Sequence, residues 1–435
     1  MNVQELCRQV DLYEPFQRRG KLRSALGLLG CTVPAAVGEQ CEIVLSHQRR
    51  VLAEVIGFSN GTSHVLPYEH AEAVRPGMPV IARGRRLSVP VGESLRGRVL
   101  DGLGRPLDGR GGIQGCSRRP LGHEIPSPLQ RAPISEPFVT GQRAIDGLLT
   151  CGRGQRIGIF GGSGVGKSTL LGEIAKGAEL DVTVIALIGE RGREVRPFLE
   201  DCLGPVGLTR SVVIVATAEQ PALLRVRAAQ MAITVAEYFR ERGRNVLLML
   251  DSLTRLAMAQ RELGLLLGEP PSARGYTPSV FQLLAGTMER LGNAARGSIT
   301  GIMTVLVEGD DFEEPISDAA RALVDGHIVL DRRLAERGHY PAINIARSLS
   351  RVFRDVTSAP QRTAARKLRG ILATHAEVED LVRVGAYVKG TSPQVDKALE
   401  LLPVVETFLR QEVADRYSLE DTRAAMEAIA ARWPF

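Results

Sequence analysis

Apolar residues recur with different periods along the 435 residues of this chain, and these periods divide it into segments. In residues 2–14, Val3, Leu6 and Val10 recur at helical spacing, which predicts a short amphipathic helix. Such a helix either covers the core of its own chain or docks onto a separate protein. Between residues 20 and 89, short apolar runs alternate with Gly, Pro and Asn-Gly pairs, which predicts a small β-barrel. Its strands are expected at residues 41–45, 51–56, 64–67 and 78–82.

The middle of the chain has another pattern. From Gly141 to about residue 356, continuous apolar runs alternate with helical segments, which predicts an α/β fold with a parallel sheet covered on both faces. A Gly- and Pro-rich stretch at 101–128 precedes it and is expected to be irregular. After residue 358 only helical signals remain, the clearest at 371–387 and 394–412. The strands are expected at 157–160, 182–188, 212–216, 246–250, 299–307 and 327–330.

The bulk composition limits the classes of protein to which this chain can belong. A hydrophobic content of 44% with 24% charged residues is typical of a soluble globular protein. No apolar run approaches the roughly 18 residues that span a bilayer, and the N-terminus lacks a signal-peptide pattern, so a cytoplasmic protein is expected. The six cysteines are scattered, which argues against disulfides and against a metal site built from them.

Charge argues against a nucleic-acid-binding surface. The net charge of +6 comes from 55 basic and 49 acidic residues, which nearly balance over so long a chain. Aromatic residues make up 4%, and no basic segment has the interleaved aromatics that stack on bases. We therefore expect no nucleic-acid partner.

The strongest motif lies between an expected strand and an expected helix. It matches the phosphate-binding pattern G-x-x-x-x-G-K-[ST], in which glycines let backbone N–H groups and a helix N-terminus face the phosphates of a nucleotide. Lys167 would reach the terminal phosphates, and the Ser168 hydroxyl would hold Mg²⁺. The motif predicts a nucleoside-triphosphate site. Its residues are Gly161, Gly162, Ser163, Gly164, Val165, Gly166, Lys167, Ser168 and Thr169.

Two further strands end in acidic residues. Because ligands bind beyond the carboxyl ends of parallel strands, these acids are expected near the phosphates. Asp251 follows the run 246–250 and either coordinates Mg²⁺ or caps the next helix; the neighbouring phosphate loop favours Mg²⁺. Glu190 and Arg191 follow the run 182–188. There the carboxylate would polarise the attacking water and the arginine would neutralise phosphate charge, unless the segment is a solvated charged loop.

From about Arg18 onward the chain resembles the ATPases that power type III protein export, flagellar and virulence-associated, which belong with the rotary ATP synthase catalytic subunits. The short segment 341–350 also fits the signature of the wider ATP-synthase group. The blocks that carry the resemblance are 140–150, the phosphate loop, 189–195, 274–280, 307–311 and 339–344.

The resemblance implies a RecA-like P-loop core and specific residue roles. Glu190 falls on the catalytic glutamate of the family and Arg191 on the adjacent phosphate-site arginine. Tyr340 matches the aromatic that packs against adenine. Arg351 matches the arginine finger that reaches into the neighbouring subunit, which implies a homohexamer. The expected division is 1–18 amphipathic arm, 19–90 β-barrel domain, 91–357 ATPase core and 358–435 C-terminal helical domain.

The resemblance also implies a function and partners. It indicates an ATP-hydrolysing motor of protein export at the cytoplasmic face of the inner membrane, in the flagellar rather than the virulence branch. The implied partners are a stator-like regulator at residues 1–18, a central stalk protein, export chaperones with their substrates, and the membrane export gate. Alternatives are a rotary ATP synthase catalytic subunit, a nucleic-acid translocase and a non-catalytic nucleotide-binding subunit; the presence of Glu190 argues against the last.

Overall fold

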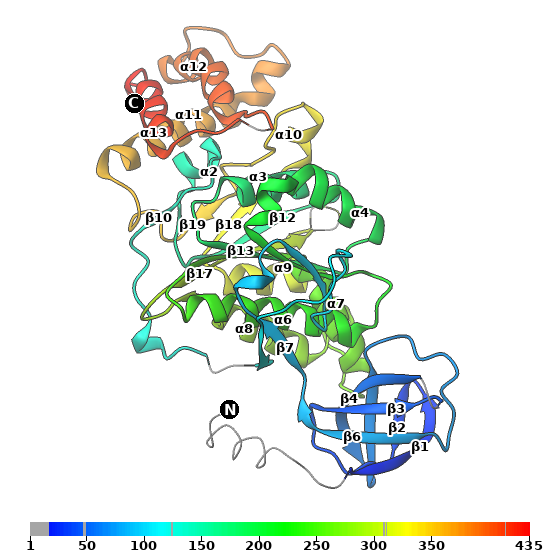
Figure 1. The fold of residues 1–435 in the computed structure, drawn as a ribbon. Helices are drawn as coiled ribbons and strands as arrows, with labels where there is room; N and C mark the ends of the chain where they lie inside the picture. Colours follow the sequence, from blue (N-terminus) through cyan, green and yellow to red (C-terminus); the bar gives the residue numbers. More distant parts are fainter. Residues whose placement is uncertain (1–16, 47–48, 123–124, 308, 310, 414) are drawn as a thin grey trace.

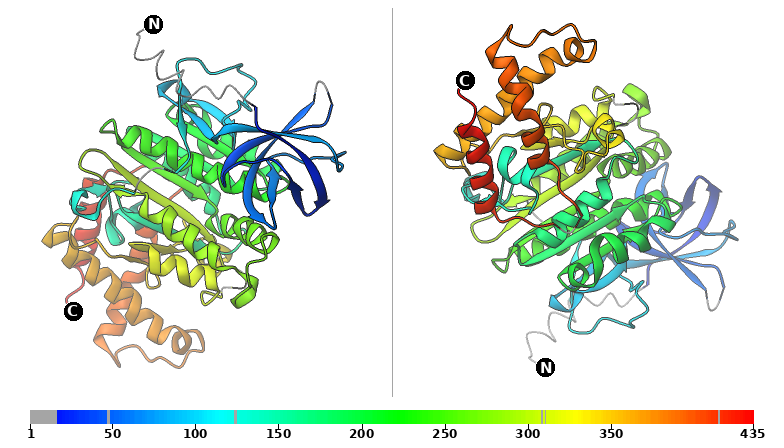
Figure 2. Two further views of the ribbon diagram at one scale, coloured as in Figure 1. Left: turned by 90° about the horizontal axis from the view of Figure 1, so that it is seen from below. Right: turned by 90° about the horizontal axis from the view of Figure 1, so that it is seen from above.

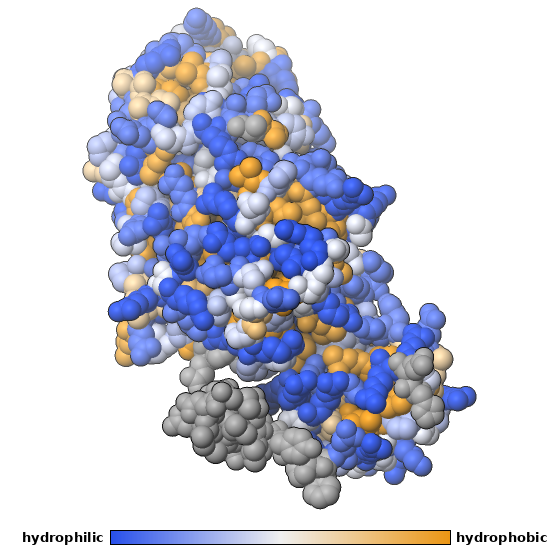
Figure 3. Space-filling view, viewed as in Figure 1, coloured by the Kyte–Doolittle hydropathy of each residue, from blue (hydrophilic) through white to orange (hydrophobic). Residues whose placement is uncertain are grey.

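The computed structural model describes residues 17–46, 49–122, 125–307, 309, 311–413 and 415–435. The helix expected at 2–14 lies outside these residues. The described chain runs from a β-barrel at one end, through a central sheet covered by helices, to a group of helices at the other end (Figures 1 and 2). Hydrophilic residues cover most of the face in Figure 3, with apolar patches between them. No helix in the described ranges combines the length and the apolar content that crossing a bilayer requires.

The N-terminal unit is a closed barrel in which all strand pairs are antiparallel, as the short apolar runs predicted. Asn60 and Gly61 both adopt positive φ, 46° and 69°, which lets a two-residue turn join β4 to β5. The strands follow the order β1-β2-β5-β4-β3-β6. They are β1 (Arg19–Leu26), β2 (Leu28–Cys31), β3 (Glu39–Val44), β4 (Arg50–Ser59), β5 (Thr62–Pro67) and β6 (Pro79–Arg86).

The central sheet has the order β19-β18-β12-β17-β15-β13-β14-β8, with β16 beside β17. All pairs are parallel except β18 with β19 and β16 with β17. The six apolar runs of the sequence form β12, β13, β14, β15, β17 and β18. The strands are β8 (Arg98–Asp101), β12 (Arg156–Gly161), β13 (Val182–Ile188), β14 (Ser211–Ala216), β15 (Asn245–Asp251), β16 (Gly292–Asn293), β17 (Ser298–Leu306), β18 (Gly326–Val329) and β19 (Leu349–Ser350).

Helices cover both faces of the sheet, because side chains of a strand alternate between faces and the central strands carry mostly apolar side chains on both. Val184 and Ile188 of β13 pack in the core shared with α6 (Ala222–Arg240) and α7 (Leu253–Leu266). Ile185 and Leu187 pack in the second core with α3 (Lys167–Gly177). The other flanking helices are α2 (Arg143–Leu148), α4 (Gly192–Pro197), α5 (Gly204–Thr209), α8 (Pro278–Glu289), α9 (Pro315–Leu323) and α10 (Arg332–Glu336).

The stretch 101–128 is more ordered than the expectation of an irregular connection. Within it, β9 (Ser117–Pro120) pairs antiparallel with β7 (Ser88–Val91). Just before it, β8 joins the edge of the central sheet beside β14. The remaining two-stranded pair, β10 (Pro137–Phe138) with β11 (Cys151–Gly152), follows. These strands were missed because they are short and carry charged or Gly and Pro neighbours.

The C-terminal unit is helical, as predicted. α11 (Ala359–Arg383) begins earlier and ends earlier than the expected 371–387, and α12 (Pro393–Leu409) corresponds to the expected 394–412. A third helix, α13 (Leu419–Ala431), was not singled out from the sequence. The Ser side chains at 358, 392 and 418 accept hydrogen bonds from the first turns of these helices, which fixes where each begins.

Candidate active site

The phosphate loop joins β12 to α3 at the middle of the sheet. β12 is hydrogen-bonded to β17 on one side and β18 on the other, so the loop starts from a rigid strand. Gly164 and Gly166 have φ values of 81° and 90°, which side chains rarely adopt. A Cβ on Gly162 would lie 3.0 Å from the guanidinium of Arg332. The glycines therefore serve both the left-handed turn and the close approach of a neighbouring side chain.

Lys167, the first residue of α3, folds back over the loop. Its Nζ donates to the carbonyl oxygens of Gly161, at 3.0 Å, and of Gly162. Burial lowers the pKa of Lys167, while the carboxylates of Asp251 and Glu190 act in the opposite direction. This ammonium lies where the loop opens, within the electrostatic reach of both acids.

Asp251 ends β15 and is only 6% exposed. The hydroxyl of Thr304 in β17 donates to its Oδ1 at 2.5 Å. Burial raises the pKa of Asp251, and the Thr304 hydrogen bond and the charge of Lys167 oppose that rise. A buried carboxylate oriented by a neighbouring strand and facing a lysine fits the cation-binding position of a phosphate site.

Glu190 follows β13 after the left-handed residue Gly189. Its Oε1 lies 3.2 Å from Nε of Arg255 in α7, and its backbone oxygen accepts from Ala218 at 2.9 Å. Burial, followed by the charge of Asp251, raises the pKa of Glu190 to about 7, against the opposing effect of Arg255. The carboxylate can therefore accept and release a proton near neutral pH.

The structure thus places Lys167, Glu190 and Asp251 within the electrostatic reach of one another, at or just after the carboxyl ends of β12, β13 and β15. Ser168 and Thr169 are exposed on the first turn of α3. Arg191 is not part of this cluster: its guanidinium is largely exposed and lies 3.7 Å from Glu194. Sequence reasoning missed Arg255 and Thr304, because their partners Glu190 and Asp251 belong to other parts of the chain. Arg255 could have been noticed from its position four residues after Asp251, whereas nothing in the sequence near Thr304 pointed to this site.

Tyr340 lies beside the loop in a pocket of about 260 Å³. Its ring is 46% exposed, and a Cβ on Gly166 would lie 3.6 Å from its Cε1. Val165 and Thr169 line one side of the pocket, and Val413 lines it from the C-terminal unit. An exposed ring over an apolar pocket beside a phosphate loop is suited to stack on a nucleotide base.

Gln411 fixes the wall of this pocket to the core. Its backbone N–H donates to the oxygen of Tyr340 at 2.9 Å. Its side chain donates to the Gly141 oxygen at 2.8 Å and accepts from the backbone N–H of Arg143 at 3.0 Å. The sequence gave no signal for Gln411, because these partners are distant along the chain.

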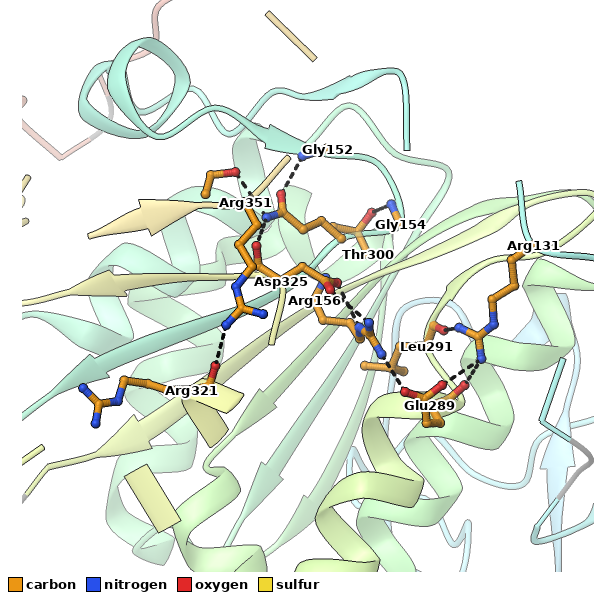
Figure 4. Close-up of polar contacts among 12 residues, drawn as sticks. Arg131, Gly152, Gly154, Arg156, Glu289, Leu291, Thr300, Arg321, Asp325 and Arg351 are labelled. Atoms are coloured by element: carbon orange, nitrogen blue, oxygen red, sulfur yellow. Dashed lines mark hydrogen bonds and ion pairs between the residues drawn. The ribbon is translucent and has the colours of Figure 1, made fainter. Parts of the chain in front are cut away.

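Arg351 lies apart from this pocket, directly after β19 at the edge of the sheet. Its side chain is exposed and donates to the backbone oxygen of Arg321 at 3.3 Å (Figure 4). Its backbone N–H donates to the Asp325 oxygen at 2.9 Å. Among the described residues, Arg351 forms no hydrogen bond or ion pair with the phosphate loop, Glu190 or Asp251.

A buried amide holds the segment that carries Arg351. Gln155 is fully buried, accepts from the Gly152 N–H at 2.8 Å, and donates to the Asp325 oxygen at 2.9 Å and to Ser350 Oγ at 3.2 Å. Asp325 also pairs with Arg156 at the start of β12 (Figure 4). The residue that precedes Arg351 is thus fastened to the strand that leads into the phosphate loop.

A parallel α/β sheet with a glycine-rich phosphate loop, and two acids at neighbouring strand ends, defines a P-loop nucleoside triphosphatase. Comparison with known proteins narrows this class. The ATP synthase alpha/beta family, nucleotide-binding domain, matches residues 141–350, and the T3SS EscN ATPase C-terminal domain matches residues 357–428. The chain belongs to the ATP synthase alpha/beta family, with the C-terminal domain of type III secretion ATPases.

Individual relatives agree over nearly the full length. The flagellum-specific ATP synthase of Bacillus subtilis is 47% identical over 99% of both chains. The type 3 secretion system ATPase of Sinorhizobium fredii is 46% identical over 95% of this chain and 92% of the relative. The solved structure of the assembled ATPase EscN from enteropathogenic E. coli is 45% identical and covers 94% of this chain and 100% of its own, with a TM-score of 0.90. The predicted fold and ATP hydrolysis as the activity are confirmed.

Proposed function

We propose that the protein is the ATPase motor of a type III protein-export apparatus, in the flagellar branch. The convergence of Lys167, Glu190 and Asp251 carries the catalytic part of this proposal. The flagellar part is supported by relatives named flagellum-specific ATP synthase, such as those of Bacillus subtilis and Treponema pallidum. The virulence branch is the alternative, because type 3 secretion ATPases have similar identity. A rotary ATP synthase subunit is less well supported.

ATP binds with its phosphates on loop residues Gly161 to Thr169 and its base against Tyr340. The backbone N–H groups of the loop and the ammonium of Lys167 neutralise the phosphate charge. Ser168 and Asp251 would hold Mg²⁺, since a hydroxyl and a carboxylate are the hard oxygen donors that this ion prefers. An ion held there would supply positive charge beside the phosphates.

Glu190 is the general base in this proposal. A water attacks the terminal phosphorus, the bond to the ADP oxygen breaks, and the water proton passes to Glu190. A pKa near 7 keeps a large share of this carboxylate ionised at neutral pH, and its ion pair with Arg255 holds it in one orientation. Arg191, exposed and next to Glu190 in the chain, supplies further positive charge to the phosphates in this proposal.

Arg351 completes a neighbouring site rather than its own. Its exposure and its position outside the nucleotide pocket support a role between subunits, as an arginine finger in a homohexamer. The relative EscN has been solved as an assembled ATPase, which supports a ring.

Partners follow from the same relationship. EscN has been solved in complex with its central stalk EscO, at 44% identity to this chain and a TM-score of 0.88. A stalk protein is therefore proposed here, and the exposed apolar residues Leu381, in the last turn of α11, and Val384 and Val388, after this helix, offer it a surface. A stator-like regulator at residues 1–18, export chaperones and substrates, and a peripheral contact with the inner-membrane export gate complete the proposed assembly on the cytoplasmic side.

The test of the catalytic proposal is Glu190→Gln. Turnover should fall at least about a hundredfold, the scale of a lost general base, while ATP binding persists. Glu200→Gln is the matched control, since this acid is exposed and paired with Arg196. Unchanged turnover in Glu190→Gln would remove Glu190 from the mechanism. Deletion of the gene should abolish export of flagellar subunits; intact flagella would assign the protein to the virulence branch.

A further inference from the structure

Five arginines surround one cleft of about 550 Å³ between the segment after β19 and the first turns of α11. Apolar side chains, among them Leu148 and Phe353, form the remainder of its lining. The arginines are Arg351, Arg354, Arg362, Arg366 and Arg369. Of these, only Arg351 has a proposed role, in the neighbouring nucleotide site.

The positive charge of this arginine cleft is not balanced by the chain itself. Arg362 donates to backbone oxygens of Arg354, at 3.1 Å, and Thr357. Arg369 donates to backbone oxygens of Ile345, at 2.9 Å, and Leu148, at 3.0 Å. In the described part of the chain, none of the five arginines forms an ion pair with a carboxylate.

Other arginines of the molecule have acidic partners. Arg98 pairs with Asp108 at 2.6 Å, and Arg290 pairs with the fully buried Glu237 at 2.7 Å. Five guanidinium groups around one cleft repel one another and attract an anionic surface, with an effect that falls as salt is added. The cleft is therefore built for an acidic partner.

Ring geometry indicates where that partner lies. This step rests on the proposed function, in which Arg351 enters the site of a neighbouring copy. In a ring, neighbouring subunits are related by rotation about the ring axis, which leaves the position of each element along that axis unchanged. The C-terminal helical unit of one subunit is therefore adjacent to the C-terminal helical unit of the next. Arg366 lies in α11 of the C-terminal unit, and Arg354 lies in the segment that leads into this helix. In the C-terminal unit, Glu412 lines the nucleotide pocket and Asp415 follows three residues later; both are exposed and have no ion pair among the described residues.

We propose that the arginine cleft of one subunit binds Glu412 and Asp415 of a second copy of this chain. When Arg366 of one copy pairs with Glu412 of the other, Arg351 of the first copy lies next to the nucleotide of the second. Glu412 lines the base pocket of that nucleotide. Assembly and completion of the active site thus depend on the same contact. The partner is a second copy because it carries the complementary charge beside the site that needs the arginine.

This contact can be tested by reversing single charges and by exchanging the two charges of a pair. Assembly of the full chain is then measured by sedimentation in the presence of ATP, with every variant made in the Glu190→Gln background. Sedimentation reports assembly whether or not ATP turns over, so its outcome is independent of the catalytic proposal. Arg366→Glu and Glu412→Arg should each weaken assembly at least about tenfold, the effect of one lost and repelled ion pair at an interface. The double exchange should restore it, and added salt should weaken the parent assembly.

The matched control is Arg432→Glu, which reverses an exposed arginine of the same helical unit that pairs with Glu400 at 3.5 Å. It should assemble like the parent. A parental urea unfolding midpoint of each monomeric variant shows that it is folded. Normal assembly of Arg366→Glu, or failure of the double exchange to restore assembly, would overturn the proposal. If Arg366→Glu assembled normally, the partner of the arginine cleft would be an acidic segment of a different protein.

Discussion

The chain carries two charged clusters that differ in how their charge is balanced. At the strand ends, Glu190 and Asp251 lie within the electrostatic reach of Lys167 and Arg255, whose positive charges oppose the rise in the pKa of these acids. In the arginine cleft, five guanidinium groups have no carboxylate partner within the described chain. The difference fits the proposed function, in which each copy binds a nucleotide at the first cluster and contributes Arg351 of the second cluster to the active site of a neighbouring copy.

The largest expected effect comes from the arginine that links the two clusters. Arg351→Ala should lower turnover about a thousandfold, because an arginine finger stabilises the charge of the transition state. ATP affinity of the isolated subunit should not change, since Arg351 lies outside its own pocket. Steady-state turnover and nucleotide titration check this result. A variant with parental turnover would place Arg351 outside catalysis.

The variant Gln155→Leu tests whether catalysis requires the hydrogen bond that holds Ser350, and with it Arg351, to the residue before β12. Gln155→Leu leaves the buried Gly152 N–H without its acceptor, which should cost about 2 kcal/mol of unfolding free energy. Turnover should fall while ATP affinity is kept, because Ser350, next to Arg351, loses a hydrogen bond. Urea unfolding and turnover measure the two effects. Gln130→Leu, at an exposed glutamine, should change neither; a Gln155→Leu protein that is destabilised but turns over normally would make Gln155 a structural residue only.

The pH dependence of turnover tests the cluster at the strand ends, in which Glu190 and Asp251 lie near Lys167 and Arg255. Because the base must be deprotonated, turnover should fall as pH drops below about 7, the pKa of Glu190. Arg255 lowers that pKa, so Arg255→Gln should raise it and move the acid limb upward by about one pH unit. A shift in the other direction, or none, would contradict the ion pair as the tuning contact. The measurement is initial turnover across pH at saturating ATP.

The smallest expected effect lies at the base pocket. Tyr340→Ala should raise KM for ATP about tenfold, the scale of one lost stacking contact, with little change in kcat. Tyr340→Phe retains the ring and should behave like the parent. A loss confined to kcat would indicate that Tyr340 acts on the chemistry instead of on the base.

Local patterns predicted the parts of this molecule that local physics determines. Continuous apolar runs predicted the buried parallel strands, and the glycine spacing predicted the tight turn between β12 and α3, where Gly164 and Gly166 have positive φ. Long-range contacts were not accessible in this way. Gln155 and Ser350 are 195 residues apart, and Arg143 and Gln411 are 268 apart, so no local signal joined them. α13 was missed because its alanines and charged residues give a weak apolar stripe.

Subunit mixing tests the central claim most directly. Arg351→Ala subunits keep Glu190, and Glu190→Gln subunits keep Arg351, so each is nearly inactive alone. In a randomly mixed ring at equal amounts, about a quarter of the interfaces would join an intact Glu190 to an intact Arg351. We predict that mixing restores turnover well above the sum of the two separate proteins. Turnover equal to that sum, in rings shown to contain both subunits, would contradict an active site shared between copies.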